Sequence, residues 1–238
     1  MTREEKLELI RILEEKERRA KTRKLFSYYP DEGPLRRELY GKHIEFFKAG
    51  AEHQERAAIA GNRCGKTTMG CFEAAVHLTG LYPHWWEGKR FDHPVDWWAA
   101  SDTSETTRDI LQYEFLGNIS EIGTGMIPKD CIIGDPARKR GVSDSIDTVQ
   151  VRHVSGGFST LAFKSYDQGR EKFQGTKKHG INLDEEPTEA IYFECLTRLM
   201  TTNGLMICTF TPLKGMSEIV MRYLNPGIEG PVSNDVEV

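Results

Sequence analysis

Residues 60–68 read AGNRCGKTT, and they connect a short apolar run at 57–60 to a helix-compatible stretch at 67–78. A glycine-containing loop between a strand and a helix is where backbone N–H groups and a helix N-terminus can face phosphate oxygens. The usual spacing, G-x-x-x-x-G-K-[ST], would put glycine at position 60, but this chain has Ala60 there and Gly61 one place later. We therefore predict a variant phosphate loop that binds ATP through Gly61, Asn62, Arg63, Cys64, Gly65, Lys66, Thr67 and Thr68.

Three residues of this loop have separate expected roles. Gly65 allows the tight turn, and the ammonium group of Lys66 reaches the β- and γ-phosphates. The hydroxyl of Thr67 is expected to coordinate Mg²⁺.

An acidic cluster follows a second apolar run, in the stretch 180–187, which reads GINLDEEP. In an α/β sheet, the carboxyl end of such a strand lies near the phosphate loop. Asp184 is expected to hold Mg²⁺ directly or through water, and Glu185 to act as the general base on the attacking water. Glu186 competes for the role of base, and only one of the two glutamates should face the nucleotide, because neighbours on an extended chain point to opposite sides.

A third apolar run, 205–210, ends at Thr211, which precedes Pro212. A hydroxyl at the tip of a strand can sense the γ-phosphate and pass its loss to the next loop. We therefore predict a coupling role for Thr211.

Apolar runs and helix-compatible stretches alternate along the rest of the chain, which predicts a mainly parallel sheet with helices on both faces. The predicted fold class is α/β, a P-loop NTPase of the RecA-like, additional-strand type. The further predicted strands are 95–100, 148–153, 159–166, 181–183 and 205–210, and the further helices are 2–22, 35–48, 104–116 and 188–200. The region 117–145 is assigned no element, and no core signal is found after 210.

Composition limits the class of protein. With 238 residues and 38% hydrophobic residues, the chain can bury one sizeable core. It contains no apolar run of about 18 residues, so we expect a protein without a membrane partner. The 5 cysteines show no CxxC spacing, which favours reduced thiols in a cytoplasm over disulfides or zinc.

The net charge of −4 argues against a protein that grips nucleic acid over its whole surface. It leaves room for local phosphate contacts, for which the basic stretches 138–140 and 18–24 are candidates. The alternative for each stretch is ordinary solvated surface. The aromatic residues Tyr82, Trp85, Trp86, Phe91, Trp97 and Trp98 are expected to pack in a core or lid and not to stack on bases.

The three motifs together resemble the Walker A, Walker B and coupling motifs of tailed-bacteriophage terminase large subunits, and the lead-in at 33–66 is similar to that family as well. The resemblance covers residues 28–225. It implies an ATPase motor domain, working in the host cytoplasm with ATP and Mg²⁺, that drives double-stranded DNA into a procapsid. It further implies a homo-oligomeric ring and contacts with a portal protein and a small terminase subunit.

The resemblance also implies roles for two arginines. Arg63 would reach the γ-phosphate or Glu185 within its own subunit. Arg170 lies shortly before the Asp184 strand, where related motors present a finger to a neighbour's ATP, and the alternative is a solvated loop arginine. The glutamine that related motors use to read adenine is replaced here by Lys42 and His43, which leaves the base contact open.

The expected organisation is an N-terminal helix and connector at 1–27, the ATPase domain at 28–225 and a tail at 226–238. The family's second half is a nuclease that this chain does not contain, so nuclease activity is not expected from the fragment. Two other functions stay open, a helicase-like motor and an ATP-dependent assembly module. Glu185 argues against the second, because a switch that only binds ATP needs no general base.

Overall fold

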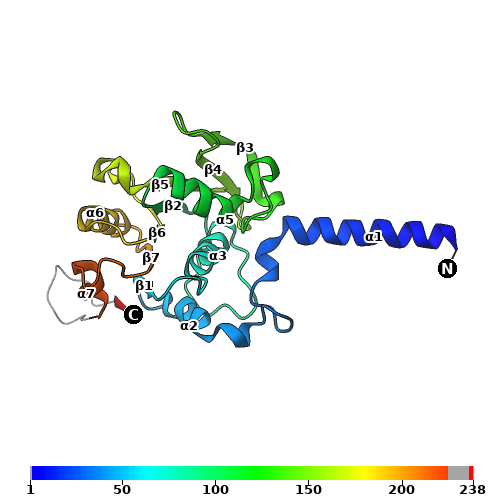
Figure 1. Ribbon diagram of the computed structural model, residues 1–238, viewed down its shortest axis with the longest axis horizontal. Coiled ribbons are helices and arrows are strands. Elements are labelled where there is room, and N and C mark those ends of the chain that lie inside the picture. The colour runs from blue at the N-terminus through cyan, green and yellow to red at the C-terminus, as the bar shows by residue number, and fades with distance from the viewer. Residues whose placement is uncertain (1, 225–235, 238) are drawn as a thin grey trace.

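A single eight-stranded sheet organises the computed structural model, which describes residues 2–224 and 236–237 (Figure 1). The strand order is β3-β4-β5-β2-β6-β7-β1-β8. The pairs from β5 to β8 are parallel, and β3, β4 and β5 pair antiparallel. The strands are β1 (Glu55–Ile59), β2 (Asp96–Ser101), β3 (Ile132–Arg138), β4 (Ile146–Arg152), β5 (Phe158–Ser165), β6 (Gly180–Asp184), β7 (Leu205–Phe210) and β8 (Val236–Glu237).

Helices cover both faces of the sheet, as the alternating sequence pattern predicted. In Figure 1, α3 and α5 lie to the right of the strands β6 and β7, and α6 and α7 lie to their left. Two hydrophobic clusters result: Trp97 and Ala99 of β2 pack with α3, and the intervening Trp98 and Ala100 face α6. The helices are α1 (Arg3–Thr22), α2 (Gly41–Ala49), α3 (Lys66–Thr79), α4 (Ser104–Thr106), α5 (Tyr113–Leu116), α6 (Glu189–Leu199) and α7 (Glu218–Leu224).

The helix that follows the phosphate loop, α3, packs directly on the central strands. Eleven consecutive residues from Met69 to Thr79 are buried, as expected for a helix enclosed by the rest of the domain. Gly70 makes the close approach possible, since a Cβ atom there would lie 3.0 Å from the amide nitrogen of Asn182 on β6. The first turns of α3 therefore pack closely against β6 and β7.

The structure confirms the predicted elements in the main and corrects three of them. Residues 35–48 form a 3₁₀ turn (Arg37–Tyr40) followed by α2, not one continuous helix. Within 104–116, a π-helical turn (Thr107–Gln112) joins α4 to α5. The statement that no core signal follows 210 was wrong, because α7 buries Ile219, Val220 and Tyr223.

Strand β3 is a further element that the sequence pattern did not predict. It contains Gly134, Asp135 and Pro136, a composition typical of loops. Its place at the edge of the sheet explains this tolerance, because an edge strand can include a proline without breaking a ladder on both sides. Two register shifts interrupt its pairing with β4, which also fits this composition.

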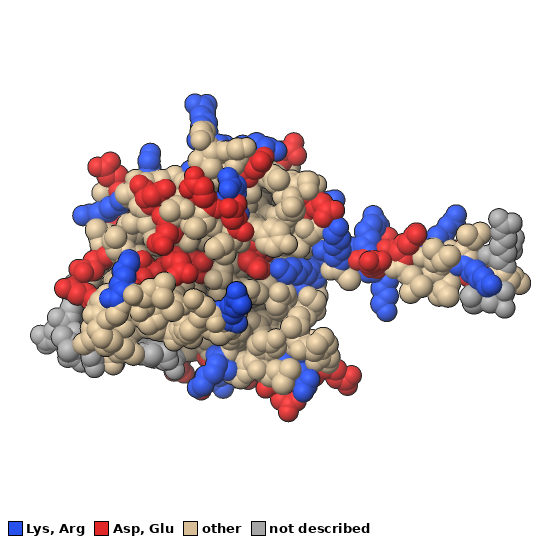
Figure 2. All heavy atoms as spheres, in the orientation of Figure 1, with Lys and Arg blue, Asp and Glu red and all other residues tan. Residues whose placement is uncertain are grey.

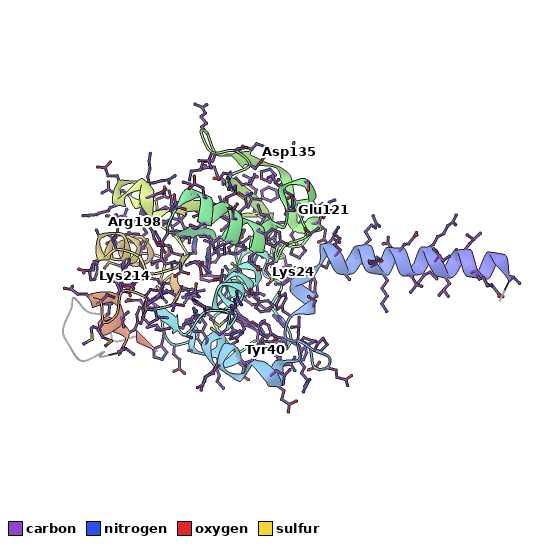
Figure 3. The ribbon with its side chains drawn as sticks, viewed as in Figure 1. Lys24, Tyr40, Glu121, Asp135, Arg198 and Lys214 are labelled. Carbon is purple, nitrogen blue, oxygen red and sulfur yellow. The ribbon has the colours of Figure 1, made fainter. Side chains whose placement is uncertain are left out.

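The predicted N-terminal helix is confirmed as α1, which projects from the body of the molecule (Figure 1). Its capping box is formed as expected, since Glu5 N donates to the Thr2 hydroxyl at 3.2 Å and Thr2 N to Glu5 at 2.7 Å. Lys21 near its end pairs with Glu121 of the body at 2.9 Å, and Figure 3 labels Glu121 at this junction. Most of the predicted tail at 226–238 lies outside the described residues.

The aromatic residues between α3 and β2 belong to the core, which confirms that prediction. Trp86 and Phe91 are buried, and Tyr82 and Trp85 pack against the same cluster as Phe72 of α3. In the part of the chain that the structure describes, no helix has the length and apolar character needed to cross a membrane.

Candidate active site

The loop between β1 and α3 turns tightly before the helix begins at Lys66. Gly65 caps the helix with a left-handed backbone, φ 84°, which glycine adopts without steric cost. Arg63 also has a left-handed φ of 64°, an uncommon conformation for a residue with a side chain. His43 of α2 lies against this turn, with its Nε2 3.3 Å from the Cys64 carbonyl oxygen. The loop therefore presents the N-terminus of a long helix to the carboxyl edge of the sheet.

The ammonium group of Lys66 lies inside the loop and contacts the tip of β7. Its Nζ donates to the carbonyl oxygens of Gly61 at 2.7 Å and Ala60 at 2.9 Å, and to the Thr211 hydroxyl at 3.1 Å. The Thr211 hydroxyl is also 2.8 Å from the side-chain oxygen of Asn62. The structure thus brings together residues that are separated by nearly the whole domain in sequence.

Asp184 lies across the inserted strand β7 from the phosphate loop. Its Oδ1 accepts hydrogen bonds from the hydroxyls of Thr67 and Thr209, both at 2.7 Å. Burial raises the pKa of Asp184 to about 6, although the two hydroxyl donors oppose the shift. A hydroxyl and a carboxylate within one hydrogen-bond length are hard oxygen ligands of the kind that Mg²⁺ takes alongside phosphates and water.

The residues present fit a magnesium ion that is held mainly through its nucleotide. Among the described residues, no group of three or more His, Cys, Asp or Glu side chains is arranged to hold a metal ion by itself. Mg²⁺ commonly uses one or two carboxylate or hydroxyl ligands and fills the remaining positions with phosphate and water. Thr67 and Asp184 match that pattern.

Glu185 occupies the tip of β6 in a left-handed conformation with φ 62°. Its backbone N–H donates to the Thr209 carbonyl at 3.0 Å, and its own carbonyl oxygen is 3.0 Å from the Tyr166 hydroxyl. Burial raises the pKa of the Glu185 carboxyl, the charge of Asp102 raises it further, and Lys66 acts in the opposite direction. The charges of Asp102 and Lys66 therefore act on this carboxyl group in opposite directions.

Glu186 has different surroundings from Glu185. Its side chain is 6% exposed, and its Oε2 atom is buried without a hydrogen-bond partner among the described residues. Lys214 reaches only its backbone carbonyl, at 3.4 Å. The two neighbouring glutamates thus face different environments. The expected alternation of an extended chain is not the cause, because Glu185 has a left-handed backbone and β6 ends at Asp184.

The two arginines singled out in the sequence lie in different places. Arg63 is exposed on the phosphate loop. Arg170 is 59% exposed, and its Nε pairs at 2.9 Å with Glu194 on α6. Glu194 also pairs at 3.1 Å with Arg198, which Figure 3 labels. Within the described residues, no hydrogen bond joins Arg170 to the phosphate loop of its own chain.

Sequence reasoning missed three residues that surround the acidic cluster. Thr209 is a hydroxyl inside an apolar strand, and that contrast could have identified it. Asp102 follows the end of β2, so the rule that parallel strands end at one edge could have placed it near Glu185. Tyr166 gave no local signal, because an aromatic residue at the end of a strand is ordinary core composition.

Comparisons with known proteins show which sequences and folds the chain is similar to. A family model described as "Terminase large subunit, T4likevirus-type, N-terminal" matches residues 58–234. The terminase large subunit of Salmonella phage P22 is 38% identical over an alignment of 252 residues. The alignment covers 97% of this chain and 48% of that protein. The chain therefore spans about half the length of this curated relative.

Solved structures show the same fold at low sequence identity. The large-terminase ATPase domain of a Thermus phage, solved as a mutant, has a TM-score of 0.52 and 16% identity, over 82% of this chain and 77% of that chain. The large terminase of a thermophilic bacteriophage, solved in complex with ADP, has a TM-score of 0.55 and 13% identity, over 82% of this chain and 43% of that chain. These likenesses confirm the predicted α/β P-loop ATPase fold.

Proposed function

Because the chain belongs to the family of phage terminase large subunits, we propose that it is the ATP-hydrolysing motor domain that drives double-stranded viral DNA into the procapsid. The observation that carries the proposal is the contact of Thr67 with Asp184 at 2.7 Å, which joins the phosphate loop to the acidic strand. Lys66 and Glu185 lie at the same edge of the sheet as this pair. The four residues together supply the groups that ATP hydrolysis requires.

The side chains divide the chemistry among them. Lys66 would hold the β- and γ-phosphates, and Thr67 and Asp184 would hold Mg²⁺. Bound Mg²⁺ neutralises charge that develops on the phosphate oxygens. Glu185 orients the attacking water and takes its proton, a role that suits a carboxyl group whose pKa is raised by burial. The ADP found with the thermophilic phage enzyme supports a nucleotide as the ligand of this fold.

Two arginines and Thr211, at the tip of β7, have the remaining proposed roles in ATP hydrolysis. Arg63 stabilises the γ-phosphate within its own subunit, and Arg170 acts on the ATP of a neighbouring subunit. Thr211 already contacts Lys66 and Asn62, so a change in the partner of Lys66 on loss of the γ-phosphate would reach the loop after β7.

The proposed partners follow from the family and from the charge distribution. They are double-stranded DNA, further copies of this chain in a ring, a portal protein and a small terminase subunit, all in the host cytoplasm. On the face that Figure 2 shows, Lys and Arg are interspersed with Asp and Glu, which suits a motor that must release DNA in each cycle. The division into 1–27, 28–225 and 226–238 is part of this proposal.

The test is ATP hydrolysis by the wild-type protein and by Lys66→Ala, with and without double-stranded DNA. The variant should lose turnover and bind ATP more weakly, because alanine cannot replace the charge-assisted hydrogen bonds of the ammonium group. Lys16→Ala is a matched control, since Lys16 is an exposed lysine on α1 to which no role is assigned. Equal turnover in wild type and Lys66→Ala would remove the phosphate-loop assignment.

The same assay, together with an assay of strand separation, distinguishes the proposed function from its alternatives. An assembly module would bind ATP with negligible turnover in the wild type. A helicase-like motor would separate the strands of a duplex, whereas a packaging motor would move along the duplex without separating its strands.

A further inference from the structure

The buried hydroxyl of Tyr166 lies at the point where the acidic strand leaves the sheet. It is 3.0 Å from the carbonyl oxygens of both Asp184 and Glu185, and 3.4 Å from that of Ala100 on β2. The hydroxyl is the donor in each of these contacts, because a carbonyl oxygen can only accept. One proton is therefore shared among carbonyl groups at the ends of two strands.

The strand ladder explains why these carbonyls need a donor from outside it. Strand β6 pairs with β2 only as far as Leu183, opposite Ala100. Beyond that pair, Asp184 still pairs with Thr209 of β7, but the ladder with β2 has ended. The carbonyl groups of Asp184 and Glu185 lie in a buried and a partly buried position, where an unpaired carbonyl is costly. The Tyr166 hydroxyl takes the place of the missing ladder partner.

The chain direction at this point is unusual, because Glu185 has φ 62° although it is not glycine. A left-handed residue with a side chain persists only where its surroundings hold it. The Glu185 N–H is held by the Thr209 carbonyl on one side, and its carbonyl is held by Tyr166 on the other. The two contacts together set the direction in which the Glu185 side chain leaves the backbone.

We propose that Tyr166 is a positioning residue, whose hydroxyl holds the left-handed turn at Asp184–Glu185 and so aims the Glu185 carboxylate at the attacking water. This inference rests on the proposed ATPase function. Tyr166 does not touch the nucleotide in this scheme. It acts through Glu185, and its loss should slow the chemical step without weakening nucleotide binding.

The kinetic test compares Tyr166→Phe with Tyr223→Phe, which removes another buried hydroxyl from the same hydrophobic cluster. The Tyr223 hydroxyl contacts Tyr192 at 2.8 Å and the Cys208 sulfur at 3.4 Å, away from the Glu185 turn. For Tyr166→Phe we expect kcat to fall roughly 10- to 100-fold, with KM for ATP within about twofold, as for a misplaced catalytic group. For Tyr223→Phe, kcat should stay within about twofold of wild type. Equal kcat values for the two variants would overturn the proposal.

A stability test addresses the turn itself and needs no activity. Glycine adopts a left-handed backbone freely, so in a Glu185→Gly background the turn no longer depends on the hydrogen bonds from the Tyr166 hydroxyl. Tyr166→Phe should therefore lower the melting temperature less in that background than in the wild type. If Tyr166→Phe alone fails to fold, the double variant should fold again. An equal loss of melting temperature in both backgrounds, or a double variant that also fails to fold, would contradict the proposal that Tyr166 holds the turn.

The two hypotheses fail in different ways. A wild-type protein without Lys66-dependent ATP hydrolysis would remove the proposed function, whatever the tyrosine variants do. An active wild type whose Tyr166→Phe and Tyr223→Phe variants hydrolyse ATP equally well would remove only the role of Tyr166.

Discussion

Glu185 and Glu186 are neighbours in the chain, but their side chains have different surroundings. The Glu185 side chain is half-buried and subject to the charges of Lys66 and Asp102, whereas that of Glu186 is buried, and its Oε2 atom has no hydrogen-bond partner among the described residues. A general base must reach the water that attacks the phosphate, and we propose Glu185 for this role because its carboxyl group is only half-buried. The choice between the two acids therefore follows from their environment and not from their type.

Glu185→Gln should bind ATP and Mg²⁺ about normally and hydrolyse ATP roughly 10²–10⁴-fold more slowly, because glutamine cannot take the proton. This corresponds to a barrier higher by about 3–5 kcal/mol. Glu186→Gln is the matched control and should have a much smaller effect. The measurement is single-turnover hydrolysis together with nucleotide affinity. A slow Glu186→Gln beside an active Glu185→Gln would mean that the wrong glutamate was assigned.

Asp184 should make the stability of the protein depend on pH in a direction opposite to that of most carboxylates. Burial raises its pKa from 3.8 to about 6, so folding favours the protonated form. This stabilisation is fully present below pH 3.8 and is lost as the pH rises through about 6. At pH 8, the charged group therefore costs up to about 3 kcal/mol, at about 1.4 kcal/mol for each pH unit.

Asp184→Asn should raise the free energy of unfolding at pH 8 by about 1–3 kcal/mol, because it removes the buried charge and keeps the oxygen that Thr67 and Thr209 contact. At pH 4 the gain should be much smaller. Urea unfolding at the two pH values, without nucleotide or magnesium, measures the difference. A gain of equal size at both values would show that the charge is not its cause.

Strand β7 and helix α1 show how differently whole elements are supported. Strand β7 is buried along its entire length, between β1 and β6, and supplies Thr209 to the site. In contrast, α1 leaves Leu7, Ile10 and Leu13 about half exposed. A helix with so little buried surface contributes little to the stability of the domain, whatever it contacts in an assembly.

Deleting residues 1–22 should lower the melting temperature by less than about 3 °C, because exposed pairs such as Lys21 with Glu121 are worth at most about 1 kcal/mol. Leu25→Ala is the control, since Leu25 lies just past the helix and is only 3% exposed. That change should cost about 2–5 kcal/mol. Differential scanning calorimetry compares the two, and a deletion as costly as Leu25→Ala would show that α1 is an integral part of the domain.

In the whole molecule, Arg170 is tied to α6 of its own chain and is still largely exposed. An exposed, paired arginine can serve a neighbouring subunit only if assembly offers it a stronger partner than Glu194. The phosphates of ATP are such a partner, because they carry more negative charge than one carboxylate.

Mixing Arg170→Ala subunits with Lys66→Ala subunits should therefore restore part of the ATPase activity that neither has alone. In a random equal mixture, about a quarter of the interfaces would join an intact phosphate loop to an intact Arg170. Arg198→Ala controls for the loss of one partner of Glu194. Absence of recovery at every mixing ratio, with assembly confirmed, would count against action across the interface.

Local features of the chain were enough to predict the phosphate loop, the acidic strand end and the fold class. The residues 61–67 and the flanking strand and helix lie together in sequence, so their chemistry and their context could be read from one window. The strands β6 and β7 are buried throughout and mostly apolar, as buried parallel strands are, and the alternation with helices predicted the order of layers.

The contacts around the acids depend on tertiary structure, because they join segments whose distance in sequence carries no information about their distance in space. Thr209 meets Asp184 only because β7 is inserted between β1 and β6, and Tyr166 meets Glu185 only because β5 and β6 both flank β2. Periodicity tells which face of a strand is buried but not which strand lies next to it. Two elements escaped prediction for different reasons. Strand β3 contains Gly134, Asp135 and Pro136, a composition typical of loops, and α7 was recognised only from its packing, which buries Ile219, Val220 and Tyr223.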